Sequence, residues 1–359
     1  MQPEARQAAA VRPRGASPTA AWPLDVSSGG LPGVAPDATF EAATLAAIRP
    51  LALRAAALFA LDPLALGGLR LRGGAGPARD AWLAALRRLL PDSMPWQRLP
   101  VSIEEDRLLG GLDLAASLAA RRSVLHRGLL AQCHGGVLVA PMAERLPGRT
   151  TAALAAVLDR RELIVEREGF GERQPAHLAV IAFDEALPED EPFAPALADR
   201  LGLDVALREE GGVGEGREGN EGEGRLDPTD ADDLDFEWPD ASALRQARER
   251  LPSVAVPDAV LEALCQATLA LGIDSARAPW WALQVARMSA AMAGRERADE
   301  ADARLAARLV LAPRATRLPA PPATDEDASP EAPPPEPERA EPPQSEADVD
   351  QHTAPPDPS

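Results

Sequence analysis

The first half of the chain alternates short apolar runs with stretches of helical periodicity. Leu69 and Leu71 alternate with polar neighbours, which predicts a short strand. Val137–Ala140 is a continuous apolar run typical of a buried strand, and Leu163–Val165 and Leu178–Phe183 are strand-like as well. Strands separated by helices indicate an α/β sandwich built on a largely parallel sheet.

Helical spacing fills the sequence between these strands and dominates the second half of the chain. Further elements are predicted as helices at Phe40–Leu61 (interrupted near Pro50), Asp80–Leu90, Leu112–Ala120, Gly128–Cys133 and Thr150–Leu158, and as a short strand at Val101–Ile103. Four more helices follow in succession at Ala241–Leu251, Pro257–Leu271, Ala278–Met292 and Asp299–Leu311. These last four predict a separate, small helical domain.

The net charge of −19 is concentrated in two segments. Glu209–Glu237 holds 12 acidic residues and two arginines, and Pro319–Ser359 holds 11 acidic residues and one arginine. The rest of the chain is close to neutral, so the acidity belongs to solvated segments and argues against nucleic-acid binding. The hydrophobic fraction of 45% is enough for a sizeable core, which the scarcity of aromatic residues makes a core of Leu, Ala and Val.

Composition also predicts where the folded parts begin and end. Residues 1–37 are rich in Pro, Gly, Ala and Ser, and are predicted to be a disordered tail. Residues 38–208 are expected to form the α/β domain, 209–240 a flexible, acidic and glycine-rich insertion, and 241–316 the helical domain. Residues 317–359 are acidic and Pro-rich, which predicts a disordered linker.

Cysteine and histidine usage points away from disulfide and metal chemistry. Cys133 and Cys265 are far apart and lack a paired-ligand spacing, which fits a reduced, cytoplasmic setting. His126 and His134 have no acidic residue between them, so no metal site is predicted there. The sequence has no clear signal peptide and no run of about 18 apolar residues, so we expect no membrane insertion.

The stretch Leu66–Leu90 has the strand, the glycine-rich loop and the helix that surround a phosphate-binding loop. In the working pattern, G-x-x-x-x-G-K-[ST], backbone N–H groups cradle the phosphates, the lysine reaches the β- and γ-phosphates, and the hydroxyl holds magnesium. Gly73 and Gly76 preserve the loop. Taken alone, this stretch is equally well interpreted as a plain strand–turn–helix with no nucleotide chemistry.

The residues that would carry the chemistry of this loop are replaced. Ala78 stands where the glycine before the lysine belongs, Arg79 where the lysine belongs, and Asp80 where the hydroxyl residue belongs. The chain has no lysine at all, and a carboxylate at this place should repel the phosphates. A solvated or ion-paired Arg79 is favoured over one that contacts a phosphate.

A longer resemblance is carried by Arg107–Leu146, RLLGGLDLAASLAARRSVLHRGLLAQCHGGVLVAPMAERL. This block resembles the AAA+ module of the magnesium chelatase ATPase subunits, and so do Val165–Gly169 and the segment Pro195–Leu203, PALADRLGL. The resemblance covers roughly Leu51–Leu318. It implies an AAA+ αβα sandwich of the P-loop type with a parallel sheet, followed by a small all-α domain.

Departures from the family pattern indicate the type of subunit. The acidic pair that closes the Walker B strand would fall at Pro141 and Met142, neither of which can hold magnesium or polarise water. Asp184 lies where a polar sensor is expected. Loss of both Walker motifs resembles the D-type subunit rather than the active I-type subunit. In that family the acidic linker leads to a von Willebrand A domain with a metal-ion-dependent adhesion site. The D-x-S-x-S segment of such a site is not found in this sequence.

The resemblance also assigns two arginines. Arg200 falls at the arginine finger, which acts in trans on the ATP of the neighbouring subunit, and Arg277 falls at sensor 2. A planar guanidinium suits this role because it spreads positive charge over several transition-state oxygens. The alternative for Arg200 is an ordinary arginine paired with Asp199 or a surface carboxylate, and Trp280 and Trp281, next to Arg277, are interpreted as packing rather than as ligand contacts.

The resemblance therefore implies a non-catalytic subunit that assembles with the I subunit, which uses ATP and Mg²⁺, and couples hydrolysis to the porphyrin-binding H subunit. The complex inserts Mg²⁺ into protoporphyrin IX for chlorophyll or bacteriochlorophyll synthesis. No cofactor is assigned to this chain itself. The alternative is an AAA+ scaffold or chaperone adaptor of the MoxR or cobalt-chelatase kind, without a role in tetrapyrrole chemistry.

Overall fold

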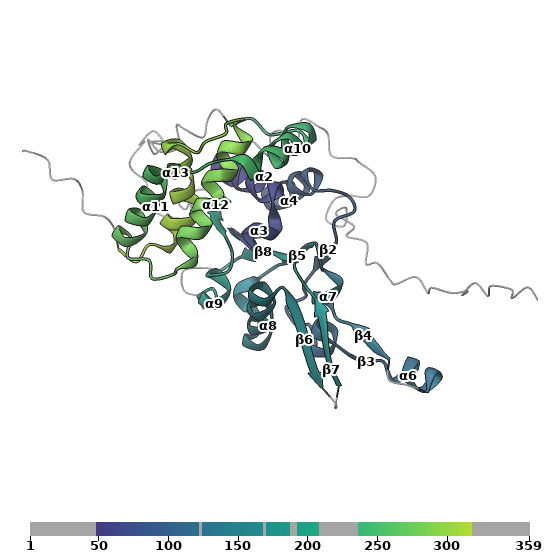
Figure 1. The fold of residues 1–359 in the computed structure, drawn as a ribbon. Helices are drawn as coiled ribbons and strands as arrows, with labels where there is room; N and C mark the ends of the chain where they lie inside the picture. Colours follow the sequence, from purple (N-terminus) through teal and green to yellow (C-terminus); the bar gives the residue numbers. More distant parts are fainter. Residues whose placement is uncertain (1–47, 122–123, 168–169, 187–191, 208–235, 318–359) are drawn as a thin grey trace, which may run out of the picture. The chain divides into compact units, whose positions relative to one another are not determined.

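The computed structural model describes residues 48–121, 124–167, 170–186, 192–207 and 236–317 (Figure 1). The predicted N-terminal tail, most of the acidic insertion and nearly all of the C-terminal linker lie outside these residues. The predicted helix at 40–61 is described from its second part onward, as α2 (Pro50–Leu61), which begins at the proline expected to interrupt it.

Five strands form one parallel sheet among the described residues, in the order β2-β5-β8-β1-β9. They are β1 (Gly68–Arg72), β2 (Trp96–Arg98), β5 (Val137–Ala140), β8 (Ala179–Asp184) and β9 (Leu203–Ala206). β1 lies between β8 and β9, with Leu69 opposite Ile181 on one side and opposite Leu203 on the other. The parallel α/β sheet inferred from the apolar pattern is confirmed.

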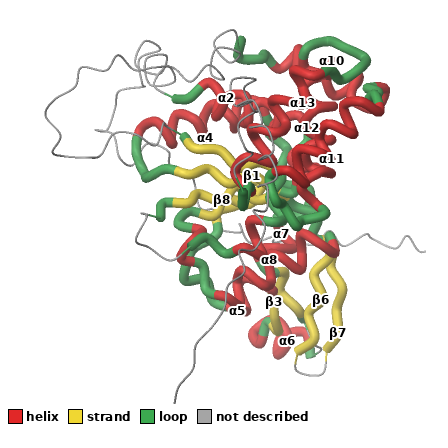
Figure 2. The backbone as a smooth tube through the Cα atoms, turned by 90° about the vertical axis from the view of Figure 1, so that its left-hand side faces the viewer, coloured by secondary structure: helices red, strands yellow, loops and turns green. Residues whose placement is uncertain are grey.

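The two faces of the sheet pack on different cores because successive strand residues point to opposite sides. In β8, Ile181 belongs to the core beneath α2 and α4 (Pro77–Leu89), whereas Val180 belongs to the core on the other face. Trp82 of α4 is fully buried and donates its indole N–H to the carbonyl of Ala52 in α2 at 2.8 Å. The elements on the other face are α5 (Glu105–Leu109), α7 (Leu129–Gln132) and α8 (Gly148–Arg160), labelled in Figure 2, and α9 (Pro195–Ala198), labelled in Figure 1.

Two antiparallel hairpins lie outside the main sheet (Figure 1). The first consists of β3 (Gly110–Leu112) and β4 (Leu125–Arg127), with α6 (Leu114–Ala120) between them. The second consists of β6 (Glu162–Arg167) and β7 (Phe170–Pro175). The run at 163–165 is therefore a strand as predicted, but it belongs to a hairpin and not to the parallel sheet.

Three further sequence expectations require correction. Val101–Ile103 is a turn rather than a strand, and the strand of this region is β2. β9 is not recognised from the sequence, because a four-residue strand containing Asp204 lacks a clear apolar pattern. The helix expected to begin at Asp80 begins at Pro77, a favoured first residue of a helix because its missing N–H needs no partner there.

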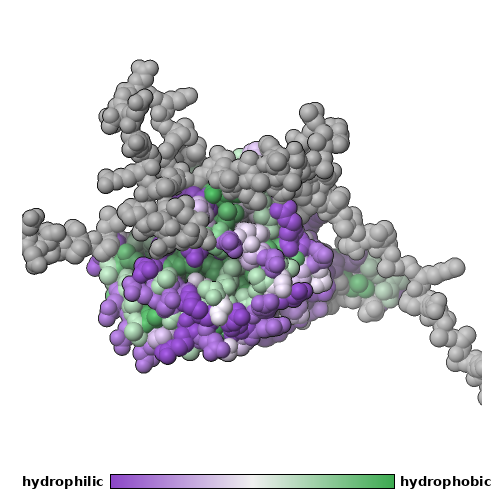
Figure 3. Space-filling model, turned by 90° about the horizontal axis from the view of Figure 1, so that it is seen from above, coloured by the Kyte–Doolittle hydropathy of each residue, from purple (hydrophilic) through white to green (hydrophobic). Residues whose placement is uncertain are grey.

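The last described part is helical, as predicted. It contains α10 (Ala241–Arg250), α11 (Asp258–Ala270), α12 (Arg277–Met292) and α13 (Glu300–Ala306), which continues through a π-helical turn to Leu311. These helices share a core with α2. The face seen in Figure 3 mixes hydrophilic and apolar side chains, as amphipathic surface helices do. None of the helices in the described part combines the length and apolar character needed to cross a membrane.

Candidate functional site

The parallel sheet divides the sequence-predicted site residues between its two edges. The loop at Gly73–Gly76 and the residue Pro141 follow the carboxyl ends of β1 and β5, at the edge where β8 ends with Asp184. Arg200 precedes β9 and therefore lies at the amino edge, where its carbonyl contacts Gly67, the residue before β1. A five-residue strand such as β1 spans roughly 16 Å, so the two sets of residues are well separated.

The glycine-rich loop keeps the expected strand–loop–helix geometry. Gly73 has a φ of 145° and donates its backbone N–H to the carbonyl of Asp184 at 2.9 Å, which fastens the loop to β8. The loop leads into α4, where Asp80 is exposed in the first turn. The strand–loop–helix arrangement is therefore present, with Asp80 at the position where the sequence pattern places a magnesium-binding hydroxyl.

Arg79 is already paired within the chain. Its Nη1 lies 2.6 Å from Oε1 of Glu185, and its guanidinium stacks over the ring of Phe183 at 4.8 Å from the centroid. Only 14% of the Arg79 side chain is exposed. The alternative of an ion-paired arginine thus describes this residue, because its charge is neutralised by the residue that follows β8.

The turn after β5 contributes another carboxylate instead of the Walker B pair. Pro141 ends the strand, and Met142 adopts a left-handed conformation with a φ of 47°. Glu144 is buried, and its Oε2 accepts the backbone N–H of Glu185 at 3.1 Å. Neither Glu144 nor Glu185 is predicted as a site residue from the sequence, although both are acidic residues just after an apolar strand.

A ladder of arginines and aspartates crosses the end of the sheet. Arg70 of β1 donates to Asp184 of β8 through Nε at 2.9 Å, and to Asp204 of β9 through Nη1 at 3.1 Å. Arg72 also donates to Asp204, at 3.0 Å. Both aspartates are buried. Asp184, expected to be a sensor, is therefore engaged in holding neighbouring strands together.

A second arginine–carboxylate cluster lies at the amino edge. Arg200 forms a bidentate pair with Asp159 near the end of α8, with Nε–Oδ1 at 3.0 Å and Nη2–Oδ2 at 2.6 Å. Its Nη1 donates to the carbonyl of Ala196 at 2.6 Å. Bidentate pairs of this kind are stronger and more directional than single contacts. The pKa of Asp159 lies below its usual value, first because Arg200 donates to its carboxylate.

Arg277 joins the same cluster from α12. Its Nη1 lies 2.5 Å from Oδ2 of Asp199, and its Nη2 lies 3.1 Å from Oδ1 of Asp159. The hydroxyl of Ser275 donates to Asp199 and accepts the backbone N–H of Arg277 at 3.2 Å. The structure thus brings together Arg200 and Arg277, the two arginines assigned from the resemblance, and it places both away from the chain's own glycine-rich loop.

Further contacts fasten the helical part to α9. Arg314 donates to the carbonyls of Ala198, at 3.2 Å, and of Leu201. Trp281 donates its indole N–H to the carbonyl of Asp199 at 3.5 Å. The position of Arg277 is therefore set by several independent contacts between the two parts of the fold.

Neither cysteine chemistry nor metal binding provides a further candidate site among the described residues. Burial raises the pKa of the Cys133 thiol to about 12, which makes it a poor nucleophile. Across the described residues, no group of three or more His, Cys, Asp or Glu side chains is arranged to hold a metal ion.

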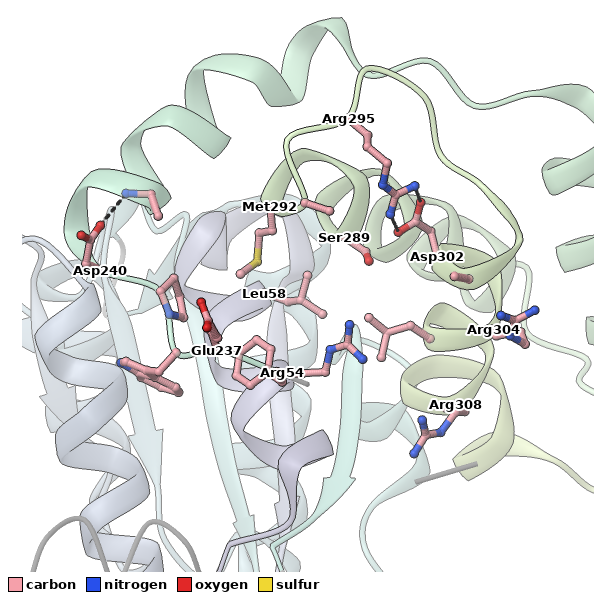
Figure 4. Close-up of a pocket in the computed structure, with 17 residues that line it drawn as sticks. Arg54, Leu58, Glu237, Asp240, Ser289, Met292, Arg295, Asp302, Arg304 and Arg308 are labelled. Carbon is pink, nitrogen blue, oxygen red and sulfur yellow. Dashed lines mark hydrogen bonds and ion pairs between the residues drawn. The ribbon is translucent and has the colours of Figure 1, made fainter. Parts of the chain in front are cut away.

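A cavity of about 690 Å³ lies among α2, residues 236–240, α12 and α13 (Figure 4). Arg54 lies over the ring of Phe236 at 5.7 Å from its centroid. Arg295 forms two hydrogen bonds with Asp302, at 2.7 and 2.8 Å. The cavity is lined by none of the sequence-predicted site residues, so it is separate from both arginine clusters.

Comparison with known proteins identifies the class. Residues 261–336 match the family model described as the AAA lid domain. A putative ATPase from Cytophaga hutchinsonii has a similar structure, with a TM-score of 0.51 and 14% identity over 75% of this chain and 83% of that one. The parallel sheet, the phosphate-loop frame and the lid together define an AAA-type α/β fold.

The particular family follows from three relatives. The chain is 38% identical to the magnesium-chelatase 60 kDa subunit of Rhodobacter capsulatus, over 74% of this chain and 40% of that protein. It is 33% identical to the 67 kDa subunit of Chlorobaculum tepidum, over 79% and 45% respectively. It is 30% identical to the 38 kDa subunit of Cereibacter sphaeroides, over 74% of this chain and 89% of that protein. The chain belongs to the magnesium-chelatase family of AAA+ subunits, and its higher identities are to the 60 and 67 kDa (D) subunits. It spans about two fifths of the length of these longer relatives.

Proposed function

We propose that this chain is a non-catalytic AAA+ subunit of magnesium chelatase. It assembles with an ATPase subunit of the I type and couples the hydrolysis of ATP there to insertion of Mg²⁺ into protoporphyrin IX by the porphyrin-binding H subunit. The pathway served is chlorophyll or bacteriochlorophyll synthesis, in the cytoplasm, without nucleic acid and without membrane insertion. The chain itself is inactive as an ATPase.

One observation carries the proposal. Arg200 and Arg277 converge on Asp159 at the amino edge of the sheet, whereas the glycine-rich loop lies at the carboxyl edge. Arginines placed there face away from any nucleotide that this chain could hold. They are suited instead to the phosphates of a neighbouring subunit, where a guanidinium stabilises charge that develops during phosphoryl transfer.

The state of the chain's own loop supports the same proposal. Arg79 is neutralised by Glu185, and the strand end that should supply two carboxylates supplies Pro141 and Met142. Phosphoryl transfer depends on positioning and on electrostatic stabilisation by a lysine, a metal ion and a base. The lysine, the residues expected to hold the metal ion and the base are replaced together, so the chain donates arginines to an active site without completing one of its own.

The adaptor alternative is not favoured, because the relatives named above are magnesium-chelatase subunits. The direct test is a magnesium-insertion assay with purified I and H subunits, with and without this chain, followed by fluorescence of the magnesium porphyrin. We expect insertion to depend on the chain and to fall when Arg200→Ala replaces it. Full Mg²⁺ insertion in the absence of the chain would contradict the proposal and favour the adaptor function instead.

A further inference from the structure

Asp159 occupies an unfavourable place for a helix. It is the penultimate residue of α8, where the negative end of the helix dipole disfavours a carboxylate. The helix itself gains nothing from this charge. Its contacts lie instead with two arginines distant in sequence, Arg200 in the segment before β9 and Arg277 at the first residue of α12.

The geometry leaves part of Arg200 available. A guanidinium has five N–H donors in a fixed plane. Asp159 accepts from Nε and from one N–H of Nη2, and the carbonyl of Ala196 accepts from Nη1. These bonds occupy three of the five donors, and one N–H remains on each terminal nitrogen. These two N–H groups belong to the same plane, so Asp159 fixes the direction in which they point.

Arg277 is held by the same carboxylate. Its Nη2 approaches Oδ1 of Asp159, and Asp199 holds its Nη1. Two guanidiniums that share one carboxylate oxygen lie close enough to repel each other without it. The side chains of Asp159 and Arg277 are 35% and 42% exposed and that of Arg200 is 19% exposed, so the cluster reaches the surface through Asp159 and Arg277.

We propose that Asp159 is a positioning residue that holds Arg200 and Arg277 as one preorganised pair aimed at the nucleotide phosphates of a neighbouring ATPase subunit. This inference rests on the proposed function. Asp159 is not expected to contact the nucleotide, since a carboxylate beside the phosphates would repel them. It acts through the arginines, and preorganisation of this kind is worth most where charge develops in the transition state.

The test is a double-mutant cycle in the assembled complex of this chain with an I-type ATPase subunit, which is saturated with ATP and Mg²⁺. Asp159→Asn keeps the shape of the side chain but removes its charge. We expect it to lower turnover by about tenfold, within the range of couplings measured between residues of one ion-pair network. In the Arg200→Ala background the same change should lower turnover by less than about twofold, because the group it positions is gone.

Controls separate positioning from folding and from the proposed function. Asp92→Asn removes an exposed carboxylate in a loop and should leave turnover unchanged. Asp159→Glu keeps the charge and should retain more turnover than Asp159→Asn, which a purely structural role would not predict. Because it keeps the charge that pairs with Arg200 and Arg277, this variant remains informative if Asp159→Asn folds poorly.

Several results would overturn the inference. Unchanged or increased turnover with Asp159→Asn would show that the carboxylate is dispensable or restrains the arginines. Equal effects in the wild-type and Arg200→Ala backgrounds would show that it acts independently of Arg200. If Arg200→Ala itself leaves turnover unchanged, the proposed function fails as well, and this separates the two failures.

Discussion

The two edges of the sheet each carry a network of arginines and carboxylates, but the networks differ in what surrounds them. At the carboxyl edge, Arg70 and Arg79 pair with residues at the ends of neighbouring strands, and Asp184 is buried among them. At the amino edge, Arg200 and Arg277 meet on a partly exposed Asp159 at the junction of three helices. In the first network the arginines are paired with buried or half-buried carboxylates of the same chain. In the second network Asp159 and Arg277 are partly exposed, at 35% and 42%, whereas Arg200 is 19% exposed.

The largest effect expected is on catalysis in trans. Arg200→Ala should lower ATP turnover of the assembled complex by as much as about 10³-fold, because a cation aimed at developing phosphate charge is lost. Arg200→Lys should restore little, since an ammonium lacks the planar fork. Steady-state turnover is the measurement, with Arg245→Ala on the exposed side of α10 as the matched control. Unchanged turnover, or loss of the fold, would leave Arg200 an ordinary ion-paired residue.

The free energy of unfolding should depend more on the network at the carboxyl edge than on the one at the amino edge. Asp184→Ala should reduce the free energy of unfolding by about 3 kcal/mol, because it leaves Arg70 partly unpaired in a buried ladder. Arg200→Ala should cost no more than about 1 kcal/mol, as expected of a pair near solvent. Denaturant unfolding of the two variants measures the contrast. Comparable losses at both edges would contradict the distinction drawn between them.

A smaller effect should appear with pH. Arg200 and Arg277 hold the pKa of Asp159 below its unfolded value of 3.8, so its contribution to stability is complete above that pH. It should disappear as the pH falls through the lower, folded pKa. The free energies of unfolding of the wild type and Asp159→Asn should differ by no more than about 1 kcal/mol at neutral pH, because solvent screens the pair. They should begin to converge as the pH falls below about 3.8 and become equal below the folded pKa. A difference that grows in acid would have the wrong sign.

The smallest effect is expected from restoring the missing lysine. Arg79→Lys should give the isolated chain no ATP turnover, because Pro141 and Met142 still supply no carboxylates for magnesium and water. A coupled phosphate-release assay on the purified variant measures this. Turnover gained by that single change would show that the carboxyl edge is less eroded than its contacts indicate.

Local pattern predicted much of the fold but little of the contacts at either edge. The apolar runs located β5 and β8 closely, because buried strands need continuous apolar residues. Periodicity identified the strand at 163–165 but not its partner, since pairing with β7 depends on the chain between them. β9 was missed because Asp204 interrupts its apolar pattern, and the arginines that pair with this aspartate lie in a neighbouring strand.

The contacts of the candidate site could not be predicted from local sequence pattern either. Arg200 and Arg277 were assigned from a resemblance, and their convergence is a property of the folded chain. Asp159 is 41 residues from Arg200 and 118 from Arg277 in sequence, so no local pattern links the three. Glu185 likewise reaches Arg79 across 106 residues. Long-range charge pairs are specified by the packing of helices and strands, which single-sequence periodicity does not contain.

The central claim is that the chain supplies arginines to a neighbouring active site while its own site performs no hydrolysis. ATP turnover by the purified chain alone tests this most directly. Turnover at background level is the predicted result, with or without Arg79→Ala, because the lysine, the magnesium ligand and the catalytic carboxylate are all absent from its loop and strand end. Steady turnover comparable to that of an ordinary AAA+ ATPase, abolished by Arg79→Ala, would contradict the claim.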